Sequence, residues 1–324
     1  MKRKLCLAAI AVVASAACNE TIVNEPEVNT GLVKLDLSLP FGETRSQGTD
    51  DERKVNGFQV YVFDSEGILE AYDNVQASTV SIECTPGSKQ IVAFVNAPEV
   101  KDVRTYEQLT SLSSDFADNG KDNFVMTGEI TADVTESAQI TIPVSRIASK
   151  IILGTVTNNL ALEHLKSKRF YVSEMFVINV AGTTGYMYDK PIELWYNKMK
   201  MDEDSQVEDL VLKKSQDSFV IPLGETHTAD YSFYAYPNAT ETDKSEAEWS
   251  PRYTRLVLKA YISNDLYYYP VSIPNLERNT AYLVNVTITR PGSDSPDSPV
   301  DLDTASVSVE VMDWADAEEI NEKI

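Results

Sequence analysis

The chain has 324 residues, with 28 basic residues against 50 acidic ones and a formal net charge of −22. This balance excludes the class of nucleic-acid-binding proteins, which hold phosphates through lysine and arginine. The hydrophobic fraction of 43% is that of a folded chain, and the length is enough for two domains of about 100 to 200 residues each.

The first 17 residues have the pattern of a secretion signal, with the basic start MKRK followed by the apolar run LCLAAIAVVASA. This run is shorter than the roughly 20 apolar residues of a membrane-spanning helix. Small residues precede Cys18 and resemble the lipobox of bacterial lipoproteins, so we expect a lipid on Cys18 that anchors the chain in the outer membrane. Ordinary signal cleavage beside an incidental cysteine is the alternative. Removal of residues 1–17 would take away three basic residues and no acidic one, which makes the net charge −25.

A strand pattern with complete alternation follows a short polar tether and covers residues 32–39. One face of this strand carries Val33, Leu35, Leu37 and Leu39. Burial of four such side chains would contribute roughly 6 to 12 kcal/mol. We therefore expect a half-buried strand whose loss would open an apolar groove.

The next segment, PFGETRSQGTDDERK, contains Pro, Gly and charged residues without any apolar period. This composition predicts an exposed loop, which is the usual place for proteolytic nicking. Arg45 lies within the loop and is followed by the small Ser46, whereas Arg53 is followed by a lysine.

Strand patterns recur through both halves of the chain at intervals typical of β-sandwiches. In the first half they cover residues 56–64, 78–85, 89–98, 123–130 and 138–156. In the second half they cover residues 169–180, 218–223, 231–237, 253–263, 266–274, 281–290 and 305–314. Helical spacing is confined to residues 105–118 and, more weakly, to residues 158–168. The predicted fold class is all-β, with two β-sandwich domains and one or two short helices.

The expected domain boundary lies near Asn158, after two strand patterns that are separated by a basic turn. We expect a signal peptide over residues 1–17 and a propeptide with the tether and first strand over residues 18–45. The two sandwich domains would then cover residues 46–158 and 159–324.

Side chains with catalytic chemistry are few, and we expect no enzyme activity, no cofactor and no metal. His164 and His227 fall in a polar helical pattern and in a turn, so both are expected at the surface. Cys84 would have no disulfide partner once Cys6 leaves with the signal and Cys18 carries lipid. Because it ends a strand pattern, we expect Cys84 to be a small buried residue.

Two other chemistries remain open alternatives. Acidic loops at residues 202–209 and 294–303 could bind calcium, but neither fits the EF-hand spacing, and the sequence cannot show whether two carboxylates pair as in a glycosidase. The tyrosine cluster DLYYYPVS at residues 265–272 could stack on sugars, although a strand that buries alternate rings has the same pattern.

The last strand pattern repeats the alternation of the first and lies beyond a Pro-, Ser- and Asp-rich linker at residues 290–304. Its apolar face carries Ala305, Val307, Val309 and Val311. Either terminal strand suits a groove between open sheet edges, and strand donation between proteins is a known recognition mode. The alternative is that each is an ordinary strand of its own domain.

In combination, these motifs resemble the FimA-type fimbrillins, the subunits of type V pili. The resemblance extends from residue 15 to residue 314 and includes the lipobox at Cys18 and the strand and loop that lead to Arg45. Its other motifs are VNGFQVYVFDSEG, IVAFVNAP, VSRIASKIIL, NLERNTAYLVNVTIT and VSVEVMDW. The resemblance implies two β-sandwich (transthyretin-like) domains and a lipoprotein precursor that an arginine-specific protease cuts. By position, the cut falls between Arg45 and Ser46, with Arg53 as the second choice.

The resemblance further implies that the cut removes the first strand and that a neighbouring subunit fills the vacated groove. The candidate donor is the C-terminal strand with Val307, Val309 and Val311. The expected function is that of a structural subunit of a surface fimbria for adhesion, with copies of itself, other fimbrial subunits and the outer membrane as partners. Arg45 favours a polymerising subunit over an anchor or tip lipoprotein of the same system. A surface glycan-binding lipoprotein is the alternative from another class, and a carboxylate-based hydrolase is a third.

Overall fold

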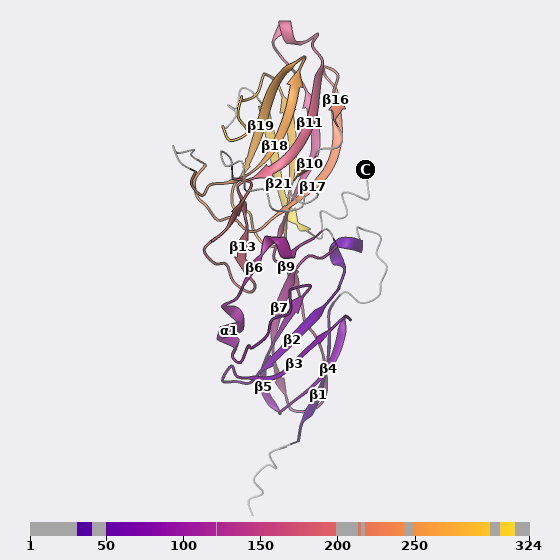
Figure 1. Cartoon of the computed structure of the whole chain (residues 1–324). Helices are drawn as coiled ribbons and strands as arrows, with labels where there is room; N and C mark the ends of the chain where they lie inside the picture. Colours follow the sequence, from indigo (N-terminus) through magenta and orange to yellow (C-terminus); the bar gives the residue numbers. More distant parts are fainter. Residues whose placement is uncertain are drawn as a thin grey trace, which may run out of the picture.

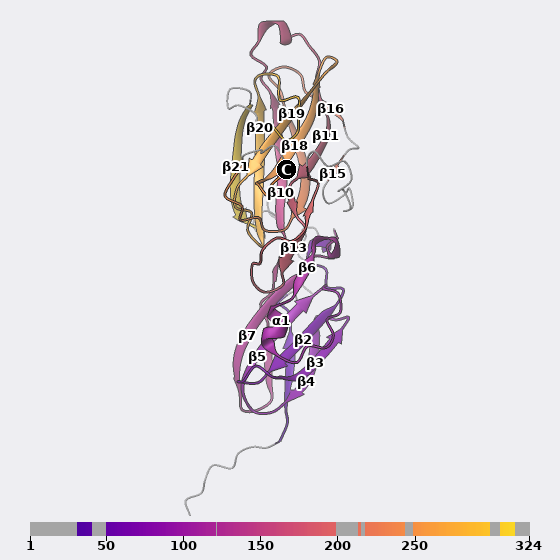
Figure 2. The ribbon, with the colours of Figure 1, turned by 60° about the vertical axis from the view of Figure 1, so that its left-hand side comes forward.

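The chain forms two β-sandwiches that lie end to end (Figure 1 and Figure 2). The structure, a computed structural model, describes residues 31–40, 50–120, 122–198, 213–214, 218–243, 249–298 and 305–314. The expected lipidation site, Cys18, and the expected cleavage site, Arg45 and Ser46, lie outside the described residues. The predicted all-β class with a few short helical turns is confirmed.

The first sandwich contains eight strands and three short helical segments of the described chain. These are β1 (Val33–Ser38), η1 (Asp50–Arg53), β2 (Phe58–Phe63), β3 (Leu69–Val75), β4 (Thr79–Cys84), β5 (Gly87–Val95), α1 (Tyr106–Thr110), η2 (Phe116–Asp118), β7 (Met126–Val134), β8 (Ala138–Thr141) and β9 (Ser145–Arg146). One sheet has the strand order β4-β1-β8 and the other has the order β3-β2-β5-β7-β9. The apolar faces of the two sheets enclose a core to which β1, β2, β4 and β5 all contribute.

The second sandwich begins with β10 (Ser149–Asn158) and ends with β21 (Ala305–Asp313). Between them lie η3 (Glu163–Leu165), β11 (Phe170–Ile178), β12 (Val180–Ala181), β13 (Thr183–Gly185), β14 (Trp195–Tyr196), β15 (Lys213–Lys214), β16 (Phe219–Val220), β17 (Thr226–Ala235), β18 (Thr254–Ile262), β19 (Asp265–Ile273) and β20 (Thr280–Ile288). One sheet has the order β17-β10-β20-β21, and the other contains β15-β11-β18-β19, with β16 also paired to β11. In this arrangement β21 is an edge strand.

The two halves are joined by more than the covalent connection between β9 and β10. The short strand β6 (Ser113–Asp115) pairs with β13, which belongs to the second half of the chain. Tyr186, just after β13, stacks on Phe94 of β5 with the ring centroids 4.7 Å apart. The hydroxyl groups of Tyr106 and Tyr188 lie 2.6 Å apart, and Tyr106 donates to Glu129. The junction is therefore packed on several sides.

Two details of the sequence interpretation differ from the structure. The strand β10, which precedes the expected boundary at Asn158, pairs with β17 and β20 of the second sandwich. The helical pattern at residues 105–118 forms a helix only over Tyr106–Thr110, because the chain then enters β6 to pair with β13. Leu109 and Phe116 are nevertheless fully buried, as the apolar spacing requires.

Candidate functional site

The strand β1 is the central strand of its sheet. It pairs antiparallel with β4, where Leu35 lies opposite Ile82, and parallel with β8, where Leu37 lies opposite Ile140. All four aliphatic side chains of the predicted apolar face are at most 4% exposed: Val33, Leu35, Leu37 and Leu39. The alternation in the sequence therefore describes a strand that is bonded on both edges and buried on one face.

The inner face of β1 covers the core of the first sandwich. The residues that pack with it include Phe58, Val60 and Val62 of β2 and Ile91 of β5. If β1 were removed, these side chains would line a groove, and the backbone groups of β4 and β8 that pair with β1 would lose their partners. Such a groove can be refilled by any strand with apolar residues at every second position.

Side chains also hold β1 on its outer, solvent-facing surface. Ser81 of β4 donates to the Asp36 carboxylate, and Lys34 forms an ion pair with it at 3.0 Å. The hydrogen bond from Ser81 and the neighbouring Lys34 hold the pKa of Asp36 below its usual range. Ser38 and Thr141 of β8 share a hydroxyl hydrogen bond of 3.0 Å. Because these contacts are exposed, the apolar face provides most of the attachment of β1.

The short helical segment η1 precedes β2, and its residue Glu52 is only 2% exposed. The Glu52 carboxylate lies 2.9 Å from the Lys150 ammonium group, which is itself buried. It also accepts hydrogen bonds from the Tyr234 hydroxyl and from the Trp314 indole, the latter at 2.7 Å. Burial alone would raise the pKa of Glu52, but Lys150 and the two hydrogen bonds outweigh burial and lower the pKa. Glu52 is thus a buried carboxylate that joins the two halves.

The C-terminal strand β21 has the opposite exposure from β1. It pairs antiparallel with β20, and Val309 lies opposite the buried Val284. The three valines of the predicted apolar face are 39%, 37% and 61% exposed at Val307, Val309 and Val311. The sequence predicted which residues share a face but not that this face would be open. The reason is that β21 lies at the edge of its sheet.

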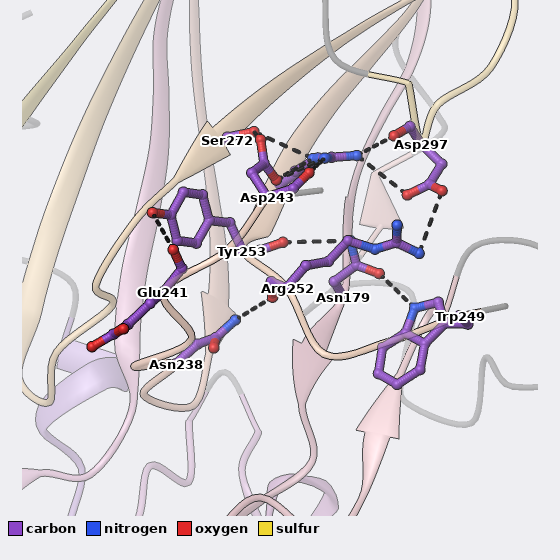
Figure 3. Close-up of polar contacts among 10 residues, drawn as sticks. Asn179, Asn238, Glu241, Asp243, Trp249, Arg252, Tyr253, Ser272 and Asp297 are labelled. Carbon is purple, nitrogen blue, oxygen red and sulfur yellow. Dashed lines mark hydrogen bonds and ion pairs between the residues drawn. The ribbon is translucent and has the colours of Figure 1, made fainter. Parts of the chain in front are cut away.

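A buried polar cluster fixes the linker that leads to β21. Arg255 forms ion pairs with Asp243 at 2.7 Å and with Asp297 at 3.2 Å, and Arg252 lies 3.4 Å from Asp297 (Figure 3). Both arginines are fully buried, and Asp297 is 2% exposed. Burial lowers the pKa of Arg252, while Asp297 opposes this effect. The carboxylate of Asp297, which belongs to the acidic loop considered for calcium, therefore forms ion pairs with two guanidinium groups.

The other sequence candidates lie apart from these strands, except for Cys84. Cys84 ends β4, is 2% exposed and belongs to the same core as β1, so burial raises the pKa of its thiol. His164 is exposed in η3, and His227 stacks on Phe219, where burial lowers its pKa. Tyr269 of the tyrosine cluster is buried. The described residues contain no group of three His, Cys, Asp or Glu side chains suited to a metal ion. Within the same ranges, no helix has the length and apolar character needed to cross a membrane.

The fold and these strands define a tandem β-sandwich protein whose first strand fills its own core and whose last strand lies at a sheet edge. The family model of the major fimbrial subunit protein (FimA) matches residues 35–194, and the chain resembles this family over that range. This match and the shared fold indicate a fimbrial protein of the cell surface.

Solved structures show the same fold at low sequence identity. A fimbrilin (FimA) from Porphyromonas gingivalis has a TM-score of 0.60 and 16% identity, with 89% of this chain and 98% of that chain covered. The tip fimbrial protein Mfa3 from the same organism, with a C-terminal truncation, has a TM-score of 0.56 and 14% identity over 88% of this chain and all of that chain. No curated protein matches the chain by sequence. A fimbrilin and a tip fimbrial protein thus share this fold.

Proposed function

We propose that the protein is a polymerising fimbrial subunit, exported as a lipoprotein through Cys18, cut after Arg45 and assembled by strand exchange. The cut separates β1 from its domain, and a strand of a neighbouring copy fills the groove between β4 and β8. The result is a surface fimbria for adhesion. Its other partners are further fimbrial subunits, an arginine-specific protease and, before the cut, the outer membrane.

The observation that carries this proposal is the contrast between the two terminal strands. β1 is bonded on both edges and, with the adjoining Leu39, buries four aliphatic side chains, whereas β21 is bonded on one edge and leaves three valines open. Both strands place apolar side chains at every second residue, so the valines of β21 can enter the positions that the aliphatic face of β1 vacates. Transfer to the groove would bury the valine side chains and pair the open strand edges.

The position of η1 favours Arg45 over Arg53 as the cut site. Arg53 is the last residue of η1, and its neighbour Glu52 is held by Lys150, Tyr234 and Trp314. A protease that cuts after Arg53 would have to pull this buried segment from the junction. Arg45 lies between β1 and η1, so a cut there detaches β1 and leaves η1 in place.

The test is determination of the N-terminus of surface fimbriae by mass spectrometry, together with an Arg45→Ala variant. We expect a Ser46 terminus in wild-type fimbriae and loss of polymer in the Arg45→Ala variant. An Arg53→Ala variant serves as the matched control and should still polymerise. A mature protein that keeps a lipidated Cys18 and has no Ser46 terminus would assign it to the anchor class instead. Unchanged fibres from the Arg45→Ala variant would overturn the cut site.

A further inference from the structure

The edge strand β21 is attached to its domain mainly through backbone bonds and through its two ends. Ala305 at its start is 6% exposed, and Trp314, just after its end, is fully buried. Except for the half-buried Met312, the side chains between them are exposed. Since backbone pairing at an exposed edge opens readily, the ends of β21 determine whether the strand stays in place.

Trp314 is buried in a site at the junction of the two sandwiches. Its ring packs against Phe124 and Tyr234, with ring centroids 5.4 Å and 5.7 Å away, and the Arg146 guanidinium lies 4.6 Å from its ring centre. Its indole N–H donates to Glu52 Oε2 at 2.7 Å. A charged acceptor in a buried site makes this one of the stronger classes of hydrogen bond.

The acceptor Glu52 lies on the segment between the cleavage loop and β2. It is fixed there by Lys150 of β10 and by the Tyr234 hydroxyl of β17. Arg146 Nε also donates to the carbonyl oxygen of Glu52 at 3.1 Å. The chain just after the cut site and the end of the last strand thus meet at one carboxylate.

The upstream end of the linker to β21 is held by different residues. Asp297 is bound by Arg255 and Arg252, and neither arginine contributes to the Trp314 site. Opening of the Trp314 site would therefore free β21 while the chain stays attached at Asp297. Residues 298–314 alone would then form an arm with a reach of roughly 55 Å, at about 3.3 Å per extended residue.

We propose that Trp314 is a latch that holds β21 on its own domain and that Glu52 is the residue that closes it. This inference rests on the proposed function in one respect, namely that β21 is the donor strand. A cut after Arg45 keeps Glu52 joined to β2, so the processed subunit retains the latch until a partner groove competes for β21. A cut after Arg53 would separate Glu52 from β2 and open the latch early.

The test is hydrogen–deuterium exchange of the uncut precursor, which requires no polymer. A Trp314→Phe variant keeps an aromatic ring but removes the N–H that Glu52 accepts. We expect amides of β21 to exchange at least about tenfold faster than in the wild type, while amides of the core strand β18 change by less than about twofold. A Trp314→Leu variant, which also loses the ring contacts, should accelerate β21 further.

A Trp249→Phe variant is the matched control. Trp249 also donates its indole N–H, to Asn179 Oδ1 at 3.1 Å (Figure 3), and its ring packs against Trp195 of β14. This variant should leave β21 exchange as in the wild type. The latch is overturned if β21 exchange is unchanged in both Trp314 variants, or if β21 and β18 accelerate equally, which indicates global unfolding. Failure of the Arg45→Ala test would instead overturn the cut-site assignment and leave this measurement intact.

Discussion

Replacement of Leu35 by alanine should weaken the precursor but not the finished fimbria. Leu35 is fully buried in β1 between β4 and β8. Leucine-to-alanine changes at such sites cost about 2 to 5 kcal/mol, because apolar transfer energy is lost and a cavity remains. If the cut removes β1, the altered residue leaves with the propeptide. Fibres assembled from the variant then contain the wild-type core with a donor strand in the groove.

The matched control is Leu109→Ala, at another fully buried leucine of the first half, which lies in α1 and stays after the cut. Urea unfolding of the precursor should show a comparable loss of stability for both variants. Dissociation of isolated fimbriae in urea should separate them, with wild-type behaviour for Leu35→Ala and weaker fibres for Leu109→Ala. If the Leu35→Ala fibres dissociate as early as those of the control, β1 remains in the polymer and strand exchange at this groove is refuted.

Two further predictions concern Cys84 and Glu52. The Cys84 thiol should resist a maleimide in the folded precursor, because β1 covers the core that contains it, and should react after cleavage in the absence of a donor strand. Peptide mapping by mass spectrometry locates the label. Equal protection of the thiol before and after the cut contradicts the prediction. Since the folded-state pKa of Glu52 is lowered from about 4.5, its charge stabilises the fold fully above about pH 5, and this contribution is lost as the pH falls through the lowered pKa. A Glu52→Gln variant should therefore lose roughly 3 to 5 kcal/mol of unfolding free energy at neutral pH. In urea titrations, the difference in unfolding free energy between the variant and the wild type should shrink towards pH 3. A difference that stays constant with pH would show that the charge of Glu52 is not the cause.

Periodicity in the sequence identified β1 and β21, but burial depends on neighbours that periodicity cannot show. Val307 and Leu35 occupy equivalent places in the two patterns, yet Leu35 is fully buried and Val307 is 39% exposed. The period of two assigns side chains to a face. Whether that face is covered depends on the strand's place in its sheet, and β21 is at an edge while β1 is central.

The polar contacts of the site could not be predicted because they join residues far apart in the chain. Asp297 belongs to a segment that has the composition of a solvated acidic loop. Of its two partners, Arg252 lies just before β18 and Arg255 lies on it. Glu52 belongs to a charged loop pattern, yet it meets Lys150 and Trp314. A pattern of charges predicts exposure, and only the tertiary fold shows which charges are buried in pairs.

Under the proposed function the protein is exported before it assembles, so the exposed edge of β21 would need protection in the monomer. A long edge strand with an open apolar face invites unwanted pairing with other strands. Glu310 and Asp313 place negative charges on the strand, and the chain as a whole is acidic, with a net charge of −22. Two copies therefore repel one another, while a specific groove can still offer apolar burial and two unpaired strand edges at once. In the proposed assembly, acidity and the contact between Trp314 and Glu52 would thus act in the same direction: both would keep β21 on its own domain until an open groove makes the exchange favourable.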